Sequence, residues 1–374
     1  MNIGIFTSIR SPYRKLQLEE FAKNKEYNIS VYYTEENYIG RAWNVSNVVG
    51  VKESSLPRIN IVKNKIYVSI GMIKAIKEND LIVLGGYEKI TYMFLSILAK
   101  LYKKKSFLLY DGISPKRVNT SENKIKLRMK KIVVENSSAI FANGKSGKAY
   151  FVKKFNYPTH KIFNQFLTVD VEKIQDLSEN REKLRKIYRD RLNIGNEKKV
   201  ILYSGRLIKR KNVDKVITAI AELKNKDEIV FVVLGDGEEN NHISTLSKDL
   251  KVCLRITGFI PDQEELFKHY FVGDVLILPS YNEPWGLVIN EAMAASLPVI
   301  ASDEVGASLD LVRNGENGYI VKAGNIEDLT DKIEKLLLHN IDNRFGRISK
   351  EIIKEWTFKA SRNSFYSMVK SILD

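Results

Sequence analysis

The sequence has 374 residues, more than one hydrophobic core usually organises, and its 44% of hydrophobic residues with 8 prolines exclude a disordered chain. Its single cysteine excludes an internal disulfide and fits a reducing compartment. The formal net charge is +15 and is concentrated in residues 1–200, where 38 Lys and Arg stand against 19 Asp and Glu.

The first half of the chain alternates between short apolar strands and amphipathic helices. Such an alternation predicts a parallel, doubly wound sheet with helices on its faces. The predicted strands cover residues 3–7, 28–34, 80–87, 105–112 and 138–144, and the predicted helices cover 13–25 and 89–103. Residues 159–170 lead out of this domain, and the densely charged stretch 170–196 is interpreted as a connecting helix followed by a turn.

A second alternating series follows residue 196. Strands are predicted at 200–205, 228–237, 253–259, 274–280 and 298–302, and helices at 212–224, 243–250, 262–272, 286–296 and 325–338. We therefore predict an α/β chain with an N-terminal Rossmann-like domain at 1–195, a C-terminal one at 196–355 and a final helix at 356–374. In open parallel sheets ligands bind beyond the carboxyl ends of the strands, so the loops there are where chemistry is expected.

Three loops of the second series carry candidate ligand-binding residues. Arg206 and Lys211, in YSGRLIKRKN, follow a strand and have the charge to clamp a diphosphate; solvated surface charge is the alternative. Gly235, in LGDG, permits close approach of a ligand to the backbone, although a tight turn needs nothing more.

The third loop, in SYNEPWGLVINEAMAAS, is the most informative of the three. Glu283 precedes a helix whose first amides, from Gly286, Leu287 and Val288, are placed to hold phosphate oxygens. Glu291 lies about two helical turns further on, where a carboxylate can accept both hydroxyls of a ribose. The alternative is that Glu283 only adjoins a helix start and that Glu291 is an exposed helix residue.

Taken in order, the motifs SGRL, LGDG, TGF, DVLILPS, NEPWGLVINEAMA and LPVIASDEVGASLDLVRNGENGYIV resemble the donor domain of glycosyltransferase family 4. This family has the GT-B fold, with two Rossmann-like domains whose parallel sheets face across a cleft, and the C-terminal helix is expected to return to the first domain. The resemblance covers about residues 200–325. In the first domain it extends only to the layout and to scattered features such as YDGISP.

The resemblance implies a role for each matching position. Arg206 and Lys211 bind the donor diphosphate, Glu283 contacts the transferred sugar and Glu291 holds the ribose. Gly258 and Phe259 meet the base, and the three amides from Gly286 to Val288 bind phosphate. Such enzymes need no bound metal or cofactor, because the cations and the helix N-terminus neutralise the leaving diphosphate. The donor substrate is expected to be a UDP- or GDP-sugar.

The sequence also departs from the family pattern. Ser296 stands where the family usually has glycine, and Ala307 and Asp310 replace a glycine and a glutamate. The family's catalytic histidine of the first domain has no counterpart. Asp111, at the end of the strand in LLYDGISP, is our catalytic candidate there, with capping of a turn as the alternative.

We therefore expect a retaining glycosyltransferase that moves a sugar to a glycan or lipid-linked acceptor in cell-surface polysaccharide synthesis. A nucleotide-sugar epimerase of the same layout is an alternative, but it requires extra carboxylates and a histidine at the sugar. A nucleic-acid-binding protein would explain the balance of +19 in residues 1–200. No basic motif with interleaved aromatic residues supports that reading, and we expect no nucleic-acid partner.

The basic first half suggests a surface for anionic lipids, although a general bias toward Lys, Asn and Ile explains the charge equally well. Ile125, Met129, Ile132 and Val133 form one helical stripe among lysines and an arginine, and this stripe either meets a membrane or packs on the domain's own sheet. The start MNIGIFTS runs directly into a strand pattern rather than a signal peptide. We expect a cytoplasmic protein, or one bound peripherally to the inner face of the plasma membrane.

Overall fold

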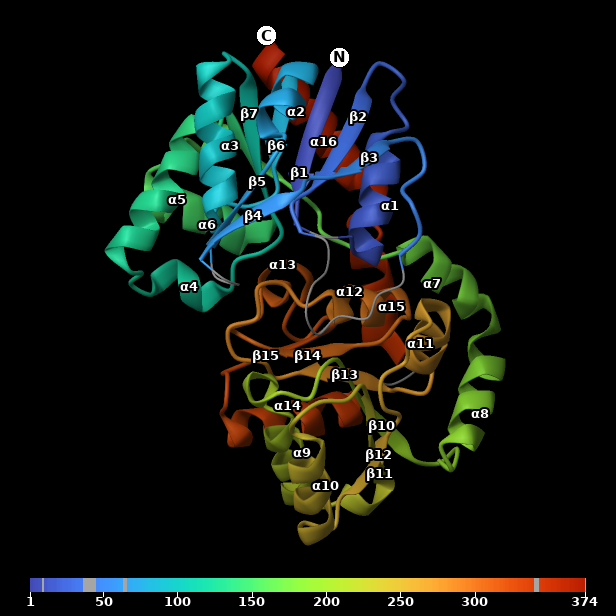
Figure 1. Ribbon diagram of the computed structural model, residues 1–374. Helices are drawn as coiled ribbons and strands as arrows, with labels where there is room; N and C mark the ends of the chain where they lie inside the picture. Colours follow the sequence, from blue (N-terminus) through green and yellow to red (C-terminus); the bar gives the residue numbers. More distant parts are fainter. Residues whose placement is uncertain (9, 36–44, 63–65, 340–342, 374) are drawn as a thin grey trace. The chain divides into compact units, whose positions relative to one another are not determined.

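The computed structural model describes residues 1–8, 10–35, 45–62, 66–339 and 343–373. The chain divides into two compact units, which are described separately (Figure 1). Unit 1 comprises Met1–Gly112, Arg117–Leu167 and Phe358–Asp374. Unit 2 comprises Ile113–Lys116 and Thr168–Thr357. Within the described ranges, no helix is both long and apolar enough to cross a bilayer.

Unit 1 is built on a seven-stranded parallel sheet of order β3-β2-β1-β6-β7-β8-β9. Its strands are β1 (Asn2–Thr7), β2 (Asn28–Tyr33), β3 (Lys52–Ser55), β6 (Leu81–Leu84), β7 (Lys105–Tyr110), β8 (Ala139–Ala142) and β9 (Ile162–Asn164). A separate antiparallel pair, β4 (Arg58–Val62) and β5 (Ile66–Ser69), was not predicted from the sequence, and neither was β3. Strand order reverses at β1, which pairs with β2 on one side and β6 on the other.

The helices of the N-terminal part connect these strands. They are α1 (Pro12–Phe21), α2 (Met72–Glu78), α3 (Ile90–Leu101), α4 (Pro115–Asn119), α5 (Lys124–Asn136), α6 (Gly144–Phe155) and the 3-10 turn η1 (Thr159–Lys161). The side chain of Asn123 caps α5 by accepting from the backbone N–H groups of Ile125 and Lys126. Helix α5 packs against α3, and Val133 is fully buried while Ile125 is 73% exposed. The stripe predicted on this helix is therefore divided between the core and the surface.

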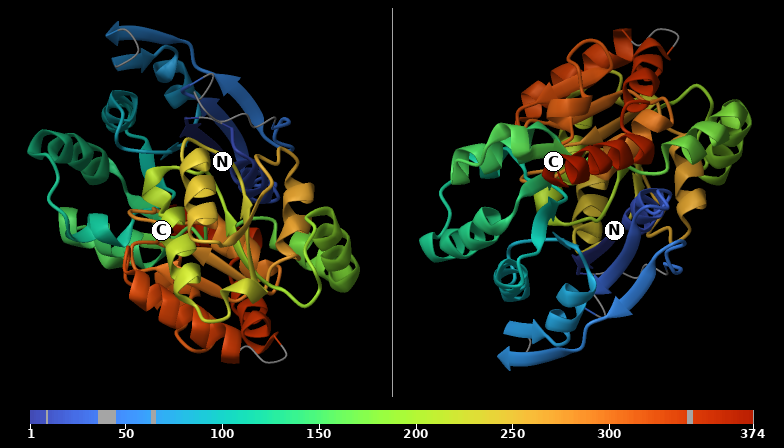
Figure 2. Two further views of the ribbon diagram at one scale, coloured as in Figure 1. Left: turned by 90° about the horizontal axis from the view of Figure 1, so that it is seen from below. Right: turned by 90° about the horizontal axis from the view of Figure 1, so that it is seen from above.

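The C-terminal helix α16 (Phe358–Leu373) belongs to unit 1, as expected. It contacts α1 and strands β8 and β9, and Figure 2 shows it in red beside this part of the chain. Phe365 is fully buried and stacks on Phe21 with ring centroids 4.2 Å apart. Met368 and Val369 are fully buried in the same cluster. The last helix therefore completes the core of the first unit although it is joined in sequence to the second.

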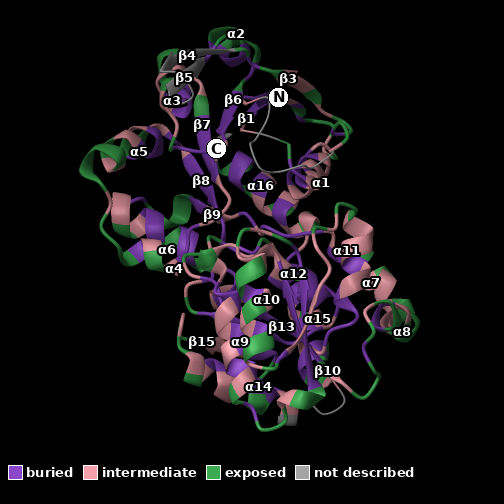
Figure 3. Ribbon diagram, turned by 60° about the horizontal axis from the view of Figure 1, so that its bottom comes forward, coloured by how far each residue is buried: buried purple, intermediate pink, exposed green. Residues whose placement is uncertain are grey.

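Unit 2 is built on a six-stranded parallel sheet of order β12-β11-β10-β13-β14-β15. Its strands are β10 (Lys199–Ser204), β11 (Ile229–Leu234), β12 (Cys253–Ile256), β13 (Val275–Leu278), β14 (Val299–Ser302) and β15 (Gly318–Val321). The central strands are apolar along their whole length, as expected for strands covered on both faces. Figure 3 shows these strands buried, while the helices around them expose their outer faces.

Helices cover both faces of this second sheet. The α-helices are α7 (Val171–Leu177), α8 (Arg181–Arg191), α9 (Val213–Glu222), α10 (Asn240–Asp249), α11 (Gln263–Tyr270), α12 (Leu287–Ala294), α13 (Ser308–Leu311), α14 (Ile326–His339) and α15 (Arg344–Ile353). Short 3-10 turns are η2 (Ser178–Asn180), η3 (Lys209–Lys211) and η4 (Lys226–Glu228). Of these elements, β15, α13 and α15 were not predicted as separate elements.

The boundary between the units differs from the one near residue 195 that the charge pattern suggested. The contacts place it between Leu167 and Thr168, so α7 and α8 belong to unit 2. Arg185 of α8 lies 2.6 Å from Asp274, and α7 contacts α12. The charged residues of this stretch therefore attach two helices to unit 2 instead of solvating a linker.

Candidate functional site

The order of strands in unit 2 identifies where a ligand would bind. Strand β10 pairs with β11 on one side and with β13 on the other, so the order reverses between β10 and β13. In open α/β sheets the crevice at this reversal, beyond the carboxyl ends of the strands, is the usual ligand site. The loops that follow β10 and β13 carry Arg206, Lys211 and Glu283, three of the residues singled out from the sequence.

Glu283 and Lys211 form an ion pair at this crevice. The Glu283 Oε2 atom accepts from Lys211 Nζ at 2.6 Å and from Arg210 Nη1 at 2.7 Å. Burial alone would raise the pKa of Glu283, but the charges of Lys211 and Arg210 outweigh it and the pKa lies below its ordinary value. Glu283 is therefore ionised at neutral pH. Only 12% of the side-chain surface of Glu283 or of Lys211 is exposed, which makes both of them ordered parts of the loop.

The sequence does not single out Arg210, because it is one of three consecutive basic residues in η3 and nothing local distinguishes it. Arg206 lies in the same loop but is exposed, and no carboxylate of the described residues lies within 4.0 Å of its guanidinium. Its backbone is held by Tyr203, whose hydroxyl donates to the Arg206 carbonyl at 2.9 Å. The structure thus brings Lys211 to Glu283 but leaves the Arg206 side chain available for a ligand.

Helix α12 begins at the same crevice. Its N-terminal cap is Gly286, which has a φ of 97°, in the left-handed region that favours glycine. The Leu287 and Val288 amides are in the first turn and have no intrahelical acceptor. These amides and the positive end of the helix dipole make the N-terminus suited to a phosphate group.

Glu291 lies on the second turn of α12 and is 8% exposed, which excludes the alternative of an exposed helix residue. Its carboxylate accepts a hydrogen bond from the hydroxyl of Tyr270, a fully buried residue at the end of α11. Burial raises the pKa of Glu291 to about 7, although the bond from Tyr270 acts in the opposite direction. Tyr270 was also missed, because its contact with Glu291 is invisible in the local pattern.

The glycine candidates differ in what their conformations require. A Cβ atom at Gly235 would lie 2.0 Å from the carbonyl oxygen of Gly205, so glycine is needed there for the close approach of two loops. Gly235 also bridges to Gly258, which has a φ of 76° and open space where its Cβ would be. The next residue, Phe259, is 59% exposed. Tight packing of the backbone therefore explains Gly235 without a ligand, whereas Phe259 is accessible to one.

Asp111 in unit 1 takes part in a network of hydrogen bonds between side chains, which explains its position better than capping of a turn does. It follows β7 and pairs with the buried Arg14, and it accepts from Tyr13 Oη at 2.8 Å and from Gln165 Nε2 at 2.9 Å. Burial would raise the pKa of Asp111, but the charge of Arg14 and these hydrogen bonds bring it below its ordinary value. A carboxylate held in this way is suited to accept a hydrogen bond from a ligand. It is a poor base, because it binds a proton weakly.

A family model described as glycosyl transferases group 1 matches residues 184–352. Residues 184–352, here called the group 1 segment, are thus similar to the group 1 glycosyltransferases. The group 1 segment contains every candidate residue of unit 2, from Arg206 to Glu291.

Curated relatives of the group 1 segment include proteins of surface polysaccharide synthesis. The lipopolysaccharide core biosynthesis glycosyltransferase LpsE of Rhizobium meliloti is 32% identical over 41% of this chain and 43% of that protein. The capsular polysaccharide biosynthesis glycosyltransferase CapM of Staphylococcus aureus is 27% identical over 70% of this chain and 68% of that protein. The chain spans less than half the length of the first curated relatives it matches, at 38%, 47% and 43%.

Solved structures resemble the chain over its whole length. Anabaena Alr3699/HepE in complex with UDP has a TM-score of 0.76 at 16% identity, covering 99% of this chain and 100% of that one. WaaG, a glycosyltransferase involved in lipopolysaccharide biosynthesis, has a TM-score of 0.63 at 14% identity, covering 97% and 98%. The two parallel sheets, of seven and six strands, are thus those of the GT-B fold predicted from the sequence.

Proposed function

We propose that the protein is a retaining glycosyltransferase that moves a sugar from a UDP- or GDP-sugar to a glycan or lipid-linked acceptor. The observation that carries this proposal is the pair of glutamates on one loop and helix of unit 2. Glu283 is ionised beside Lys211, and Glu291 is buried on the second turn of the helix that starts between them. This spacing suits a nucleoside diphosphate sugar, with the sugar near Glu283, the diphosphate at the helix N-terminus and the ribose at Glu291.

In this reaction the bond between the anomeric carbon and the diphosphate breaks, and a new bond forms to the acceptor oxygen, whose proton is released. Negative charge develops on the departing diphosphate. Arg206, Lys211 and the first amides of α12 offer positive charge to it, so no metal or cofactor is required. Retention of the anomeric configuration is inferred from the family.

We assign acceptor binding to unit 1, with Asp111 as its principal contact. The Gln165 Oε1 atom is buried beside Asp111 and has no hydrogen-bond partner among the described residues. A hydroxyl group of a sugar acceptor would satisfy this oxygen and bridge to the carboxylate. The names of LpsE and CapM support a polysaccharide or its lipid-linked precursor as the acceptor class.

Turnover of a panel of UDP-, GDP- and ADP-sugars tests the proposal directly. Replacing Arg206 or Lys211 by alanine should lower kcat about 100-fold or more, because each cation contributes roughly 3 to 4 kcal/mol to stabilising the departing charge. Lys209→Ala is the matched control, since Lys209 is an exposed lysine of the same short turn, and it should retain activity. Unchanged turnover in both Arg206→Ala and Lys211→Ala would refute the assignment.

Product analysis separates the transferase from the epimerase. NMR of the product should show a new glycosidic bond with the anomeric configuration of the donor. Recovery of an isomerised nucleotide sugar, without any acceptor product, would favour the epimerase instead.

We further propose that unit 1 contacts an anionic membrane surface, which would place the enzyme at the inner face of the plasma membrane. The support is the excess of 29 Lys and Arg over 12 Asp and Glu in residues 1–167, which belong to unit 1 apart from 113–116, together with exposed apolar side chains beside lysines. Ile125, 73% exposed, lies between Lys124 and Lys126, and Leu101 is 71% exposed.

Sedimentation with vesicles measures this contact. Phosphatidylglycerol vesicles should retain the protein at low salt and release it at high salt, and phosphatidylcholine vesicles should not retain it. Ile125→Glu should weaken retention, because it places a negative charge among the lysines. Equal retention of the protein by both kinds of vesicle would contradict the membrane proposal, and it would not affect the proposal for the donor site.

A further inference from the structure

Two adjoining cavities lie on unit 2 away from the donor-site loops. Their volumes are about 280 and 440 Å³, and both are lined by Arg181 and Asn343. None of their lining residues belongs to the loops after β10 and β13. Both shared residues hold the far end of α12: Arg181 Nη1 donates to the Ala295 carbonyl at 2.6 Å and Asn343 Nδ2 to the Ser296 carbonyl at 3.2 Å. The cavities thus lie at the opposite end of α12 from Gly286.

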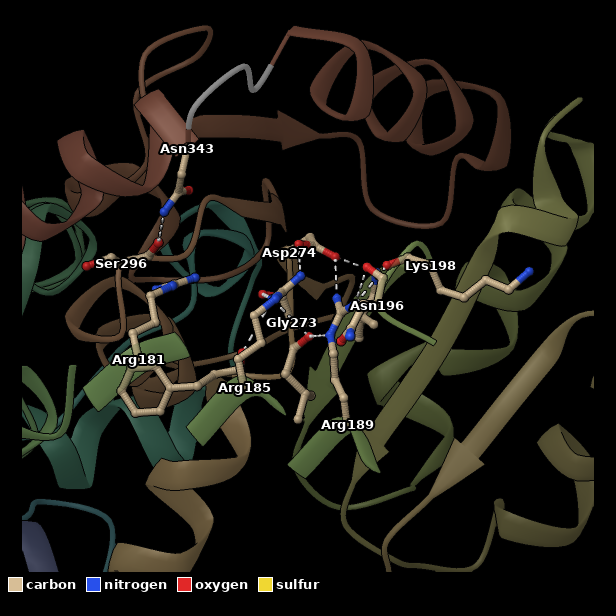
Figure 4. Close-up of polar contacts among 12 residues, drawn as sticks. Arg181, Arg185, Arg189, Asn196, Lys198, Gly273, Asp274, Ser296 and Asn343 are labelled. Carbon is tan, nitrogen blue, oxygen red and sulfur yellow. Dashed lines mark hydrogen bonds and ion pairs between the residues drawn. The ribbon is translucent and has the colours of Figure 1, made fainter. Parts of the chain in front are cut away.

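Three arginines follow one another along α8 in this region, and two of them, Arg181 and Arg185, line the smaller cavity with Lys199, Glu182 and Asp274 (Figure 4). Arg185 and Arg189 share Asp274, at 2.6 and 3.0 Å. Asp274 also accepts from the backbone N–H of Val200 at 2.7 Å, so both of its oxygens are occupied. The single negative charge of Asp274 is therefore already committed to two guanidinium groups.

Arg181 has no such partner. No carboxylate of the described residues lies within 4.0 Å of its guanidinium, and the same holds for Lys199 and Lys350, which line the two cavities. Burial and the like charge of Arg185 lower the pKa of Arg181, and the carboxylates of Glu182 and Asp274 offset this only in part. The cavity wall thus carries more positive charge than its own carboxylates neutralise, in a place where water is partly excluded.

A phosphate group fits these conditions. It has several acceptor oxygens and at least one negative charge, and arginine binds it through a planar fork of donors. Asn343 lines both cavities and adds a side-chain amide. Apolar ligands do not suit a lining of this kind, because they would leave the guanidinium of Arg181 desolvated without a counter-charge.

We propose that Arg181 and Lys350 bind a phosphorylated small molecule at a second site on unit 2, distinct from the donor site. The site stands on the cavities and on the unpaired cations, and it does not depend on the proposed transferase activity. Inorganic pyrophosphate is a suitable probe, because it carries the required charge and fits a cavity of a few hundred Å³.

Calorimetric titration of pyrophosphate into an Arg206→Ala, Lys211→Ala double variant favours the second site, because two of the three cations of the donor site are then absent and the third, Arg210, pairs with Glu283. In that background, Arg181→Gln should weaken pyrophosphate binding at least tenfold, as expected for a lost charge-assisted contact. Arg191→Gln is the matched control, since Arg191 is on the same helix, pairs with Glu265 and lines neither cavity.

The outcomes separate the possibilities. Loss of all pyrophosphate binding in the double variant, with no effect of Arg181→Gln in the wild-type background, would overturn the proposal and leave the donor site as the anion site. An equal loss in Arg181→Gln and Arg191→Gln would also overturn it, because it would indicate unspecific charge. If Arg181→Gln does not fold, Lys350→Gln provides the same test without removing the contact to Ala295.

The phosphate could belong to a free metabolite or to a lipid headgroup, and a vesicle arm distinguishes them. Binding of pyrophosphate but not of phosphatidylglycerol vesicles through Arg181 would identify a free phosphorylated ligand. A lipid headgroup would be identified if the vesicles retain the wild-type protein and the Ile125→Glu variant but do not retain the Arg181→Gln variant. Either result supports the site.

Discussion

Glu291 gives the protein a stability that depends on pH. Its pKa in the folded state is raised to about 7, above the ordinary carboxyl value, so the folded state binds this proton more tightly than the unfolded state. The resulting stabilisation is complete at acid pH and is lost as the pH rises through about 7. Glu291→Gln removes the buried charge, so we expect the variant to exceed the wild type in unfolding free energy at pH 8 by on the order of 2 to 3 kcal/mol.

Urea denaturation at pH 5 and pH 8 measures this effect, and the two proteins should differ little at pH 5. Glu334→Gln, on an exposed position of α14, serves as the control and should change stability little at either pH. The same Glu291→Gln variant should bind UDP at least tenfold more weakly at pH 8, because the ribose hydroxyls lose an ionised acceptor. A stability difference that is equal at both pH values would argue against a raised pKa.

Helix α12 ends with a residue in a conformation that favours glycine. Ser296 has a φ of 59°. The N–H of Leu297 donates to the Ala292 carbonyl at 2.9 Å, and the N–H of Ser296 donates to the Met293 carbonyl at 3.0 Å. This is the Schellman arrangement, in which a left-handed residue follows the helix. Ser296→Gly should therefore raise the unfolding free energy by roughly 0.5 to 1 kcal/mol, since the side chain no longer strains the backbone.

Denaturant unfolding of Ser296→Gly measures the gain, with Ala295→Gly as the control. Ala295 has a φ of −78°, so a glycine there relieves nothing and should cost stability. If the two glycines have the same effect, the strain at Ser296 is not the cause.

Most elements of unit 2 can be predicted from sequence because they carry their own periodic pattern, whereas β15, α13 and α15 are not predicted as separate elements. Apolar runs such as Ile229–Leu234 end in glycine or proline loops, and the candidate residues stand on those loops. Contacts between segments were not predictable in the same way. Tyr270 meets Glu291 from another helix, and Arg14 meets Asp111 from a segment 97 residues away. Neither partner is distinguished by its neighbours in sequence.

At the scale of the whole chain, the position of the boundary shows how a charge pattern can mislead. A dense run of Lys, Arg, Asp and Glu is also typical of a solvated linker, so the pattern of residues 170–196 predicts a helix that connects two domains. In the structure, Arg189 is fully buried and donates to the backbone carbonyls of Val272, Gly195, Asn196 and Lys198. Only the three-dimensional contacts reveal that these charges bind a helix to unit 2.

Truncation after Thr357 tests the division into units. The deletion removes α16, and with it the fully buried side chains of Phe365, Met368 and Val369 from the core of unit 1. Burying side chains of this size contributes about 1.5 to 3 kcal/mol each, so the loss approaches the whole stability of an ordinary domain. Unit 1 should therefore unfold or exchange its amide hydrogens rapidly. The sheet of unit 2 should keep its protection from exchange, because that unit contains its own strands and helices from Thr168 to Thr357.

Hydrogen exchange read by mass spectrometry reports on each unit separately, and UDP titration of the truncated chain adds a functional readout. Protection lost equally in β10 and in β7 would show that the two units fold as one, which contradicts the division drawn from the contacts.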